Sequence, residues 1–156
     1  MAFDLPRRVA TEAAGTAALL ATVVGSGIMA DALSADDAVS LLANALSTGA
    51  MLVVLITLLR PISGAHLNPL VSLVALARRE LPPHAALAYV AAQLAGGLAG
   101  VLLAHLMFDL PLLQAATTAR AGLGQWTGEF AATFGLIALV LIAAPRRDAS
   151  VAALVG

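Results

Sequence analysis

The 156-residue sequence contains no cysteine and no lysine, and it has few charged or aromatic side chains. The missing cysteines exclude disulfides, thiolate chemistry and cysteine-ligated metals. Charged residues make up 11% of the chain and hydrophobic residues 61%, whereas a soluble domain has roughly 25% charged residues. A net charge of −1 with scattered arginines argues against nucleic acid as a partner. The composition therefore indicates a membrane protein whose partner is the lipid bilayer.

Four apolar runs are long enough to cross a membrane. A helix needs about 20 apolar residues to span a hydrocarbon core about 30 Å thick. Each run must be helical, because a lone strand would leave its backbone groups unpaired in lipid. The expected spans cover residues 10–30, 39–59, 85–106 and 126–144.

The first run also has features of a cleaved signal peptide. Arg7 and Arg8 precede it, and Ala30-Asp31-Ala32 follows with the small residues of a cleavage site. Against cleavage, the run is longer than a usual signal core and contains Glu12. A retained first span is the favoured interpretation.

The distribution of arginine predicts the orientation in the membrane. Four alternating crossings place seven of the eight arginines on one side, and the opposite loops carry aspartates and Arg120. The positive-inside rule then places the N-terminus in the cytoplasm, with a multi-pass chain in the inner (plasma) membrane of the cell. The seven arginines are Arg7, Arg8, Arg60, Arg78, Arg79, Arg146 and Arg147.

The segment "PISGAHLNPLVSLVALARRE", residues 61–80, predicts a helix too short to span a bilayer. Pro61 and Gly64 are expected to end the second span. Asn68 is a good N-cap, and Pro69 suits the first helical position. A helix over residues 68–78 would be about 16 Å long, which is about half the hydrocarbon core.

This half-helix is expected to enter the membrane and return. Residues 62–67 would then be irregular backbone at membrane depth, which is tolerated only where protein or a water-filled cavity surrounds it. The alternative is an amphipathic helix on the cytoplasmic surface. Its sequence "PLVSLVALA" has almost no polar face, so the re-entrant interpretation is favoured.

A short pattern recurs at the start of the first and fourth spans. Glu12 precedes Thr16 by four residues, and Glu129 precedes Thr133 by four residues. An odd number of crossings separates them, which is typical of the inverted repeats of channels and transporters. The second repeat is incomplete, and "VAALVG" resembles the opening of a fifth span. The expected organisation is one transmembrane domain over residues 1–156, with a first repeat over 8–108 and the start of a second over 126–156.

The box "SGAHLNP" followed by an apolar half-helix resembles the first signature box of the aquaporin (major intrinsic protein) channels. Glu12 with Gly15-Thr16, the run "YVAAQLAGGLAG" in the third span, and Glu129 with Thr133-Phe134 are similar to the same family. The resemblance implies an all-α, aquaporin-like bundle of four transmembrane helices plus one re-entrant half-helix. It also implies homotetramers and passive passage of water and small neutral solutes, with no cofactor.

The sequence departs from the family pattern in two ways. Leu70 stands where the family usually has alanine, so that the box is NPL. The second box and the constriction arginine near it have no counterpart in these residues.

Several residues are candidates for the pore. As N-cap, Asn68 can use its oxygen within the helix and direct its NH₂ donors to a water or hydroxyl oxygen. The resemblance implies that the carbonyls of Gly64, Ala65 and His66 line the cytoplasmic vestibule. It also places Thr48 at the outer constriction, where a small side chain predicts passage of glycerol-like polyols or undissociated metalloid acids. The His66 side chain has two interpretations, a structural role in the loop or a proton carrier or ligand, and the structural role is favoured.

Polar groups inside spans are costly in lipid, so Glu12 and Gln93 need partners. The family analogy gives them, with Glu129, the role of anchoring re-entrant loops. A proton-coupled transporter would use the same groups as a relay, but would need more of them. An intramembrane enzyme is not supported, because His66, His84 and His105 lie in different segments and no catalytic or metal-ligand spacing occurs. The remaining alternative is a non-conducting four-span remnant, or a half-channel that needs a partner half.

Overall fold

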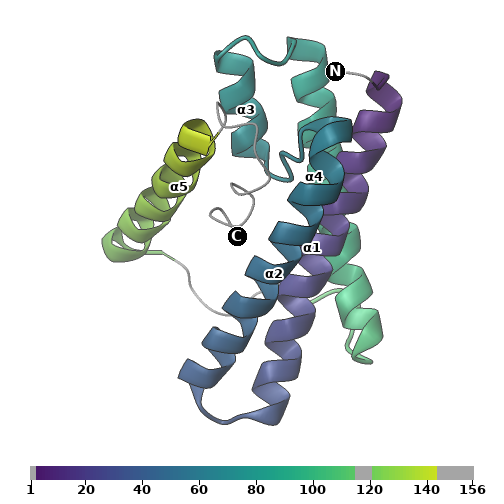
Figure 1. The fold of residues 1–156 in the computed structure, drawn as a ribbon. Helices are drawn as coiled ribbons and strands as arrows, with labels where there is room; N and C mark the ends of the chain where they lie inside the picture. The colour runs from purple at the N-terminus through teal and green to yellow at the C-terminus, as the bar shows by residue number, and fades with distance from the viewer. Residues whose placement is uncertain (1–2, 115–120, 144–156) are drawn as a thin grey trace. The chain divides into compact units, whose positions relative to one another are not determined.

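The computed structural model describes residues 3–114 and 121–143, and in these ranges the only regular structure is helical. Four of the helices are long and apolar enough to cross a membrane, and the fifth is a half-helix, as predicted (Figure 1). Residue 144, Arg120, Arg146, Arg147 and residues 151–156 lie outside the described ranges. The helices are α1 (Leu5–Leu33), α2 (Asp37–Ser63), α3 (Pro69–Ala77), α4 (Pro83–Met107) and α5 (Leu123–Ala143).

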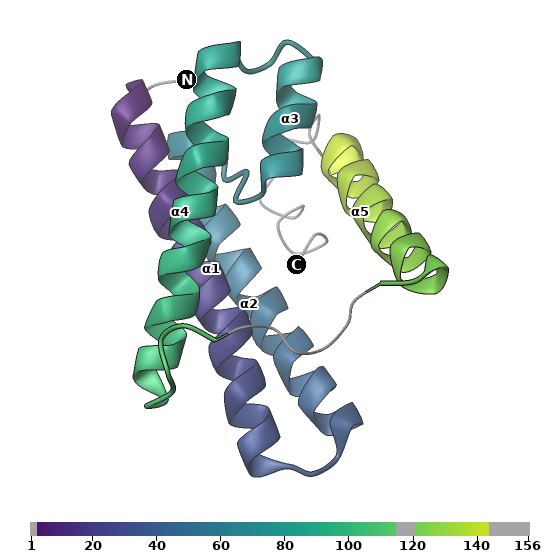
Figure 2. The same cartoon turned by 180° about the vertical axis from the view of Figure 1, so that it is seen from behind.

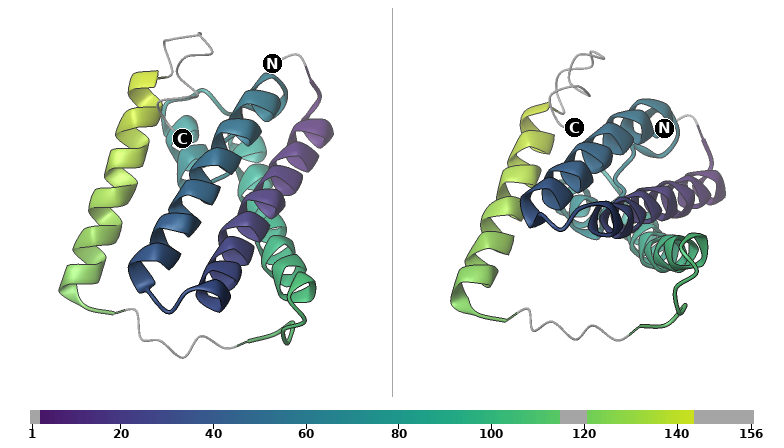
Figure 3. Two further views of the ribbon diagram at one scale, coloured as in Figure 1. Left: turned by 60° about the horizontal axis from the view of Figure 1, so that its bottom comes forward. Right: turned by 90° about the horizontal axis from the view of Figure 1, so that it is seen from below.

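The chain divides into two units at Leu112 and Leu113, and each is described by itself. In the first unit, α1 and α2 form a helical hairpin (Figure 3). Asp36 caps α2 by accepting a hydrogen bond from the Ala38 N–H at 2.9 Å. The side chain of an N-cap residue satisfies one of the free N–H groups at a helix start, so the turn between the two helices is defined locally.

The prediction that Pro61 ends the second span is wrong. Helix α2 continues through Pro61 to Ser63, although a proline costs the bond to the carbonyl four residues earlier. The helical turn still closes, because the Gly64 N–H donates to the Arg60 carbonyl at 3.1 Å. Gly64 has a φ of 98° and forms the left-handed C-cap, a conformation that suits glycine.

Helices α1 and α4 pack with their backbones close together, and α1 lies against both α2 and α4 (Figures 1 and 2). A Cβ atom at Gly96 would overlap the carbonyl oxygen of Ala13, and one at Gly100 would overlap that of Ala17. Small residues four apart allow such close approach of membrane helices. The glycines at positions 96 and 100 therefore determine how α4 sits on α1.

We expect Gly96→Leu to destabilise the protein by about 1–3 kcal/mol or more, as for overpacking of a core. The matched control is Gly97→Ala, because a Cβ at Gly97 meets its nearest neighbours only at 3.8 Å. Alanine also favours a helix by about 1 kcal/mol over glycine, so the control should be neutral or slightly stabilising. Unfolding of the detergent-solubilised variants measures both effects, and equal stability of the two variants would contradict this packing.

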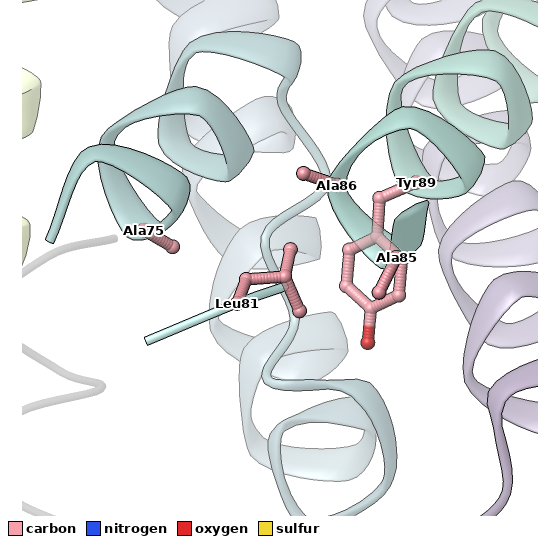
Figure 4. Close-up of a cluster of buried hydrophobic side chains, with 5 residues drawn as sticks. All are labelled: Ala75, Leu81, Ala85, Ala86 and Tyr89. Atoms are coloured by element: carbon pink, nitrogen blue, oxygen red, sulfur yellow. The ribbon is translucent and has the colours of Figure 1, made fainter. Parts of the chain in front are cut away.

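Helix α3 packs on α4 through a cluster of small and apolar side chains around Tyr89. Figure 4 shows Tyr89 projecting from α4, with its hydroxyl at the far end of the ring. The chain leaves α3 through a tight turn in which the Glu80 N–H donates to the Ala75 carbonyl at 2.9 Å. The cluster thus fixes the far end of the half-helix. Its members are Ala75, Leu81, Ala85, Ala86 and Tyr89.

The first unit buries several polar side chains and exposes many large apolar ones. Large leucines on α2 and α4 are exposed, whereas several polar side chains are buried among the helices. In a soluble protein such buried polar groups are uncommon and large exposed apolar patches are rare, so the exposed faces suit lipid. The buried polar residues are Glu12, Thr16, Ser40, Ser63, Ser72 and Gln93. Exposed leucines on these helices include Leu41, Leu42, Leu46, Leu58, Leu87, Leu94, Leu98 and Leu106.

The second unit contains α5. The helix begins after Gly122, whose φ is 145°, and the Trp126 N–H donates to the Gly122 carbonyl at 3.0 Å. Phe130 and Phe134 stack along one face with ring centroids 6.1 Å apart. Trp126 at the helix start is exposed, and tryptophan is enriched at membrane interfaces.

Candidate functional site

The segment between α2 and α3, residues 64–68, is the candidate loop. Gly64 is in the left-handed region, and so are Ala65 with a φ of 52° and Leu67 with a φ of 50°. A left-handed conformation costs a residue with a side chain about 1–2 kcal/mol. Such strain persists only where surrounding contacts hold it, so the loop needs specific partners.

Glu12 on α1 supplies most of those partners. Its side chain is fully buried, with 0% exposure. One carboxylate oxygen accepts from the Ser63 hydroxyl at 2.6 Å and from the His66 N–H at 3.0 Å. The other accepts from the Leu67 N–H at 2.7 Å and from the Gln93 amide at 2.9 Å. One carboxylate thus connects α1, the end of α2, the loop and α4.

These contacts determine which way the loop carbonyls point. In a planar trans peptide unit, the N–H and the preceding C=O point in opposite directions. The N–H groups of Ala65, His66 and Leu67 bind the Ser63 hydroxyl or Glu12. The carbonyls of the preceding residues, Gly64, Ala65 and His66, therefore point away from Glu12. The result is a row of three acceptors along one side of the loop.

Asn68 ends this row at the start of α3. Its side-chain oxygen accepts from the Leu70 N–H at 2.8 Å and caps the helix. The side chain is partly exposed, and its NH₂ group donates to no other group within residues 3–114 and 121–143. Among the described residues, no group donates to the three loop carbonyls, so a pair of donors directly follows three acceptors without a partner there.

Side chains of α3 and α4 also contact the loop and its anchor Glu12. The Gln93 amide donates to both Glu12 and the Ser72 hydroxyl, at 2.9 and 3.0 Å. The Ser72 hydroxyl also lies 3.0 Å from Nδ1 of His66. The His66 ring meets the Tyr89 ring edge-on, with centroids 5.3 Å apart. His66 is therefore held between two partners, with its ring partly exposed.

Thr48 lies on α2, away from this network. Its hydroxyl donates to Oδ1 of Asn44 at 3.5 Å, and the Asn44 amide donates to the Val23 carbonyl of α1 at 2.8 Å. Gly27 makes room for Asn44, because a Cβ there would lie 3.0 Å from the Asn44 amide nitrogen. Asn44 therefore connects the region of Thr48 to α1.

Glu129 lies on α5 in the second unit, and its side chain is exposed. The structure brings together Glu12, Gln93 and the loop residues, which all belong to the first unit. Whether Glu129 anchors a second loop stays a prediction, because such a loop is not among the described residues.

Three residues that contact the loop were not named as site residues from the sequence: Ser63, Ser72 and Tyr89. The signal for Ser72 was available, since it is the one polar side chain in "PLVSLVALA" and lies four residues after Asn68. Residues four apart lie on the same helix face. Ser63 belongs to the quoted box, but nothing in the sequence identifies its contact with Glu12.

The site offers hydrogen bonds to a neutral polar molecule. Free carbonyls accept from hydroxyl or water hydrogens, and the Asn68 amide donates to their oxygens. The N-terminus of α3 adds a partial positive charge, which disfavours cations. In the part of the chain that the structure describes, no group of three His, Cys, Asp or Glu side chains could hold a metal ion.

Comparisons with known proteins bear on the family of the chain. The profile of the protein family described as Major intrinsic protein matches residues 2–155. The aquaglyceroporin AqpS of Rhizobium meliloti is 58% identical over 139 residues, which cover 89% of this chain and 60% of that protein. The neurogenic protein big brain of Drosophila melanogaster is 37% identical over 108 residues, or 65% of this chain and 15% of that protein. The chain thus spans about 60% of the length of the aquaglyceroporin.

Proposed function

Since the chain belongs to the major intrinsic protein family, we propose that it forms a membrane channel for passive passage of water and small neutral solutes. The observation that carries this proposal is the row of three loop carbonyls pointing away from Glu12 and ending at the Asn68 amide. A water molecule or a polyol that enters the path loses hydrogen bonds to bulk water, and the groups of this row can form hydrogen bonds in their place. A hydrogen bond between neutral groups contributes only about 1 kcal/mol net, so each step along the row is reversible.

The roles of the site residues follow from this arrangement. Glu12 and Gln93 anchor the loop, and the carbonyls of Gly64, Ala65 and His66 with the Asn68 amide line the path. His66 has a structural role, because Ser72 and Tyr89 hold its ring. Glu129 is assigned the matching anchor role in the second repeat.

The orientation and location are also part of the proposal. Arg7, Arg60 and Arg78 lie at the start of α1, the end of α2 and the end of α3, which form one end of the first unit. The positive-inside rule places this end, and the N-terminus, in the cytoplasm. The protein would then lie in the plasma membrane, and the family resemblance supports a homotetramer.

A glycerol-like solute is the favoured cargo besides water, with undissociated metalloid acids as a further class. Two observations support this: the similar protein of Rhizobium meliloti is named an aquaglyceroporin, and Thr48 is a small polar side chain at the position assigned to the outer constriction. A small residue leaves a wider and more polar passage than an aromatic ring.

The test is flux through liposomes that contain the full-length protein, measured by light scattering after osmotic shifts with an impermeant solute or with glycerol. We expect both water and glycerol to cross faster than in empty liposomes. Thr48→Phe should reduce glycerol flux more than water flux, because the ring narrows the passage. Equal loss of both fluxes would contradict the role of Thr48, and no flux in the wild type would contradict the channel.

A further inference from the structure

Tyr89 contacts Ser63, the last residue of α2 before the candidate loop, and Arg8 contacts Tyr89. Tyr89 is fully buried, with 0% exposure, and its hydroxyl donates to the Ser63 carbonyl at 2.7 Å. Nε of Arg8 donates to the same hydroxyl at 2.9 Å. The Arg8 guanidinium also lies 5.2 Å from the centre of the Tyr89 ring. We propose that Arg8 and Tyr89 are positioning residues. They hold the Ser63 carbonyl in place and so determine the position of the first residue of the candidate loop.

Arg8 determines the direction of the hydrogen bond from Tyr89. A phenol has one hydrogen, which could point to either neighbour, but an arginine is a donor only and cannot accept it. The hydroxyl must therefore accept from Arg8 and direct its own hydrogen to Ser63. A charged donor also polarises the hydroxyl and strengthens the bond that it makes in turn.

The Ser63 carbonyl is a sensitive point for the loop. It belongs to the last turn of α2, where carbonyls have no partner within the helix. The same residue donates its hydroxyl to Glu12 and accepts from the Ala65 N–H at 3.1 Å. A shift of Ser63 would therefore move the first of the three carbonyls that we assign to the path.

Tyr89 contacts the loop a second time through His66, whose ring meets the Tyr89 ring edge-on. The two contacts lie on either side of the carbonyls of Gly64 and Ala65. Glu12 accepts from the N–H groups of His66 and Leu67. Tyr89 binds the Ser63 carbonyl before the loop carbonyls and contacts the His66 ring after them. This inference rests on the proposed function only for its transport consequences, because the contacts themselves can be tested without transport.

The first experiment uses the fact that Tyr89 is the one tyrosine in the sequence. Full-length protein with ¹³C at the tyrosine ring carbon that bears the hydroxyl gives a single reporter of that hydrogen bond by NMR. Arg8→Met keeps a long side chain and removes the donor, so the signal should shift. The control is Arg7→Met, because Arg7 lies over the Phe3 ring, 4.8 Å from its centre, and should leave the signal in place.

The second experiment measures glycerol flux in liposomes. Arg8→Met and Tyr89→Phe should each lower flux about two- to tenfold, the range expected for one lost hydrogen bond. The double variant should lose no more than either single variant, because residues that act through one contact are not additive. Arg8→Lys, which keeps a charged donor, should recover part of the flux.

Two results would overturn the inference. One is an unchanged tyrosine signal in Arg8→Met, and the other is wild-type flux in a folded Tyr89→Phe protein. A wild-type protein that passes no solute would contradict the proposed function instead, and the NMR comparison would still decide whether Arg8 directs the Tyr89 hydroxyl.

Discussion

Replacing Glu12 by glutamine is expected to cost the folded protein about 2–4 kcal/mol, since each buried donor left without a partner costs about 1–3 kcal/mol. The carboxylate accepts four hydrogen bonds at a fully buried position. A glutamine has one acceptor oxygen, so its NH₂ group would face either the Ser63 hydroxyl and His66 N–H, or the Leu67 N–H and Gln93 amide. We expect the strained loop to lose its conformation and solute flux to fall to the level of empty liposomes.

The matched control is Glu80→Gln, which makes the same chemical change at the surface. Glu80 pairs with Arg78 at 2.7 Å, and both side chains are about half exposed. Exposed pairs contribute little to stability, so this variant should match the wild type in unfolding and in flux. A Glu12→Gln protein with wild-type stability and flux would show that the carboxylate does not hold the loop.

The helices could be predicted because their causes are local. An apolar run of about 20 residues must form a helix in lipid, and all four expected spans are helical in their described parts. Their ends were less accurate: α1 covers Leu5–Leu33, whereas the prediction began at residue 10 and ended at residue 30. The hydropathy of a run marks the part that lies in hydrocarbon, and polar residues at either end continue the helix outside it.

The half-helix was also predictable from local chemistry. Asn68 caps it and Pro69 begins it, as residue preferences at helix starts suggest. Pro61 gave the wrong boundary, because the cost of one lost hydrogen bond near a helix end does not outweigh the cap that Gly64 provides one turn later. Residue preferences identify Pro61 and Gly64 as possible helix ends, but they do not predict which of the two ends the helix.

The partners inside the site could not be derived from local rules. Glu12 and Gln93 are 81 residues apart, yet they form a direct hydrogen bond. The cost of burying polar groups predicts that each needs a partner, and the family resemblance suggests the loop. The left-handed conformations of Ala65 and Leu67 had no signal at all, because neither residue favours them. They exist because Glu12 binds the two N–H groups that follow Ala65 and His66.

Asn68→Asp should lower glycerol flux about fivefold while the fold stays intact. Aspartate is as good an N-cap as asparagine, and its charge is favourable at the start of α3, so stability should be unchanged. The carboxylate has no donors, however, and the oxygen of a passing solute would lose a hydrogen bond worth about 1 kcal/mol. A negative charge on the path would also attract cations that the wild type disfavours.

Two further variants separate the cap from the donor. Asn68→Ser keeps a capping oxygen and one hydroxyl donor, so it should retain stability and an intermediate flux. Asn68→Ala removes both functions and should lose about 1 kcal/mol of stability from the missing cap as well as the flux. If the donor matters, flux falls in the order asparagine, serine, aspartate at constant stability. If flux instead follows stability across the series, Asn68 is a cap alone, and the path depends on the loop carbonyls without it.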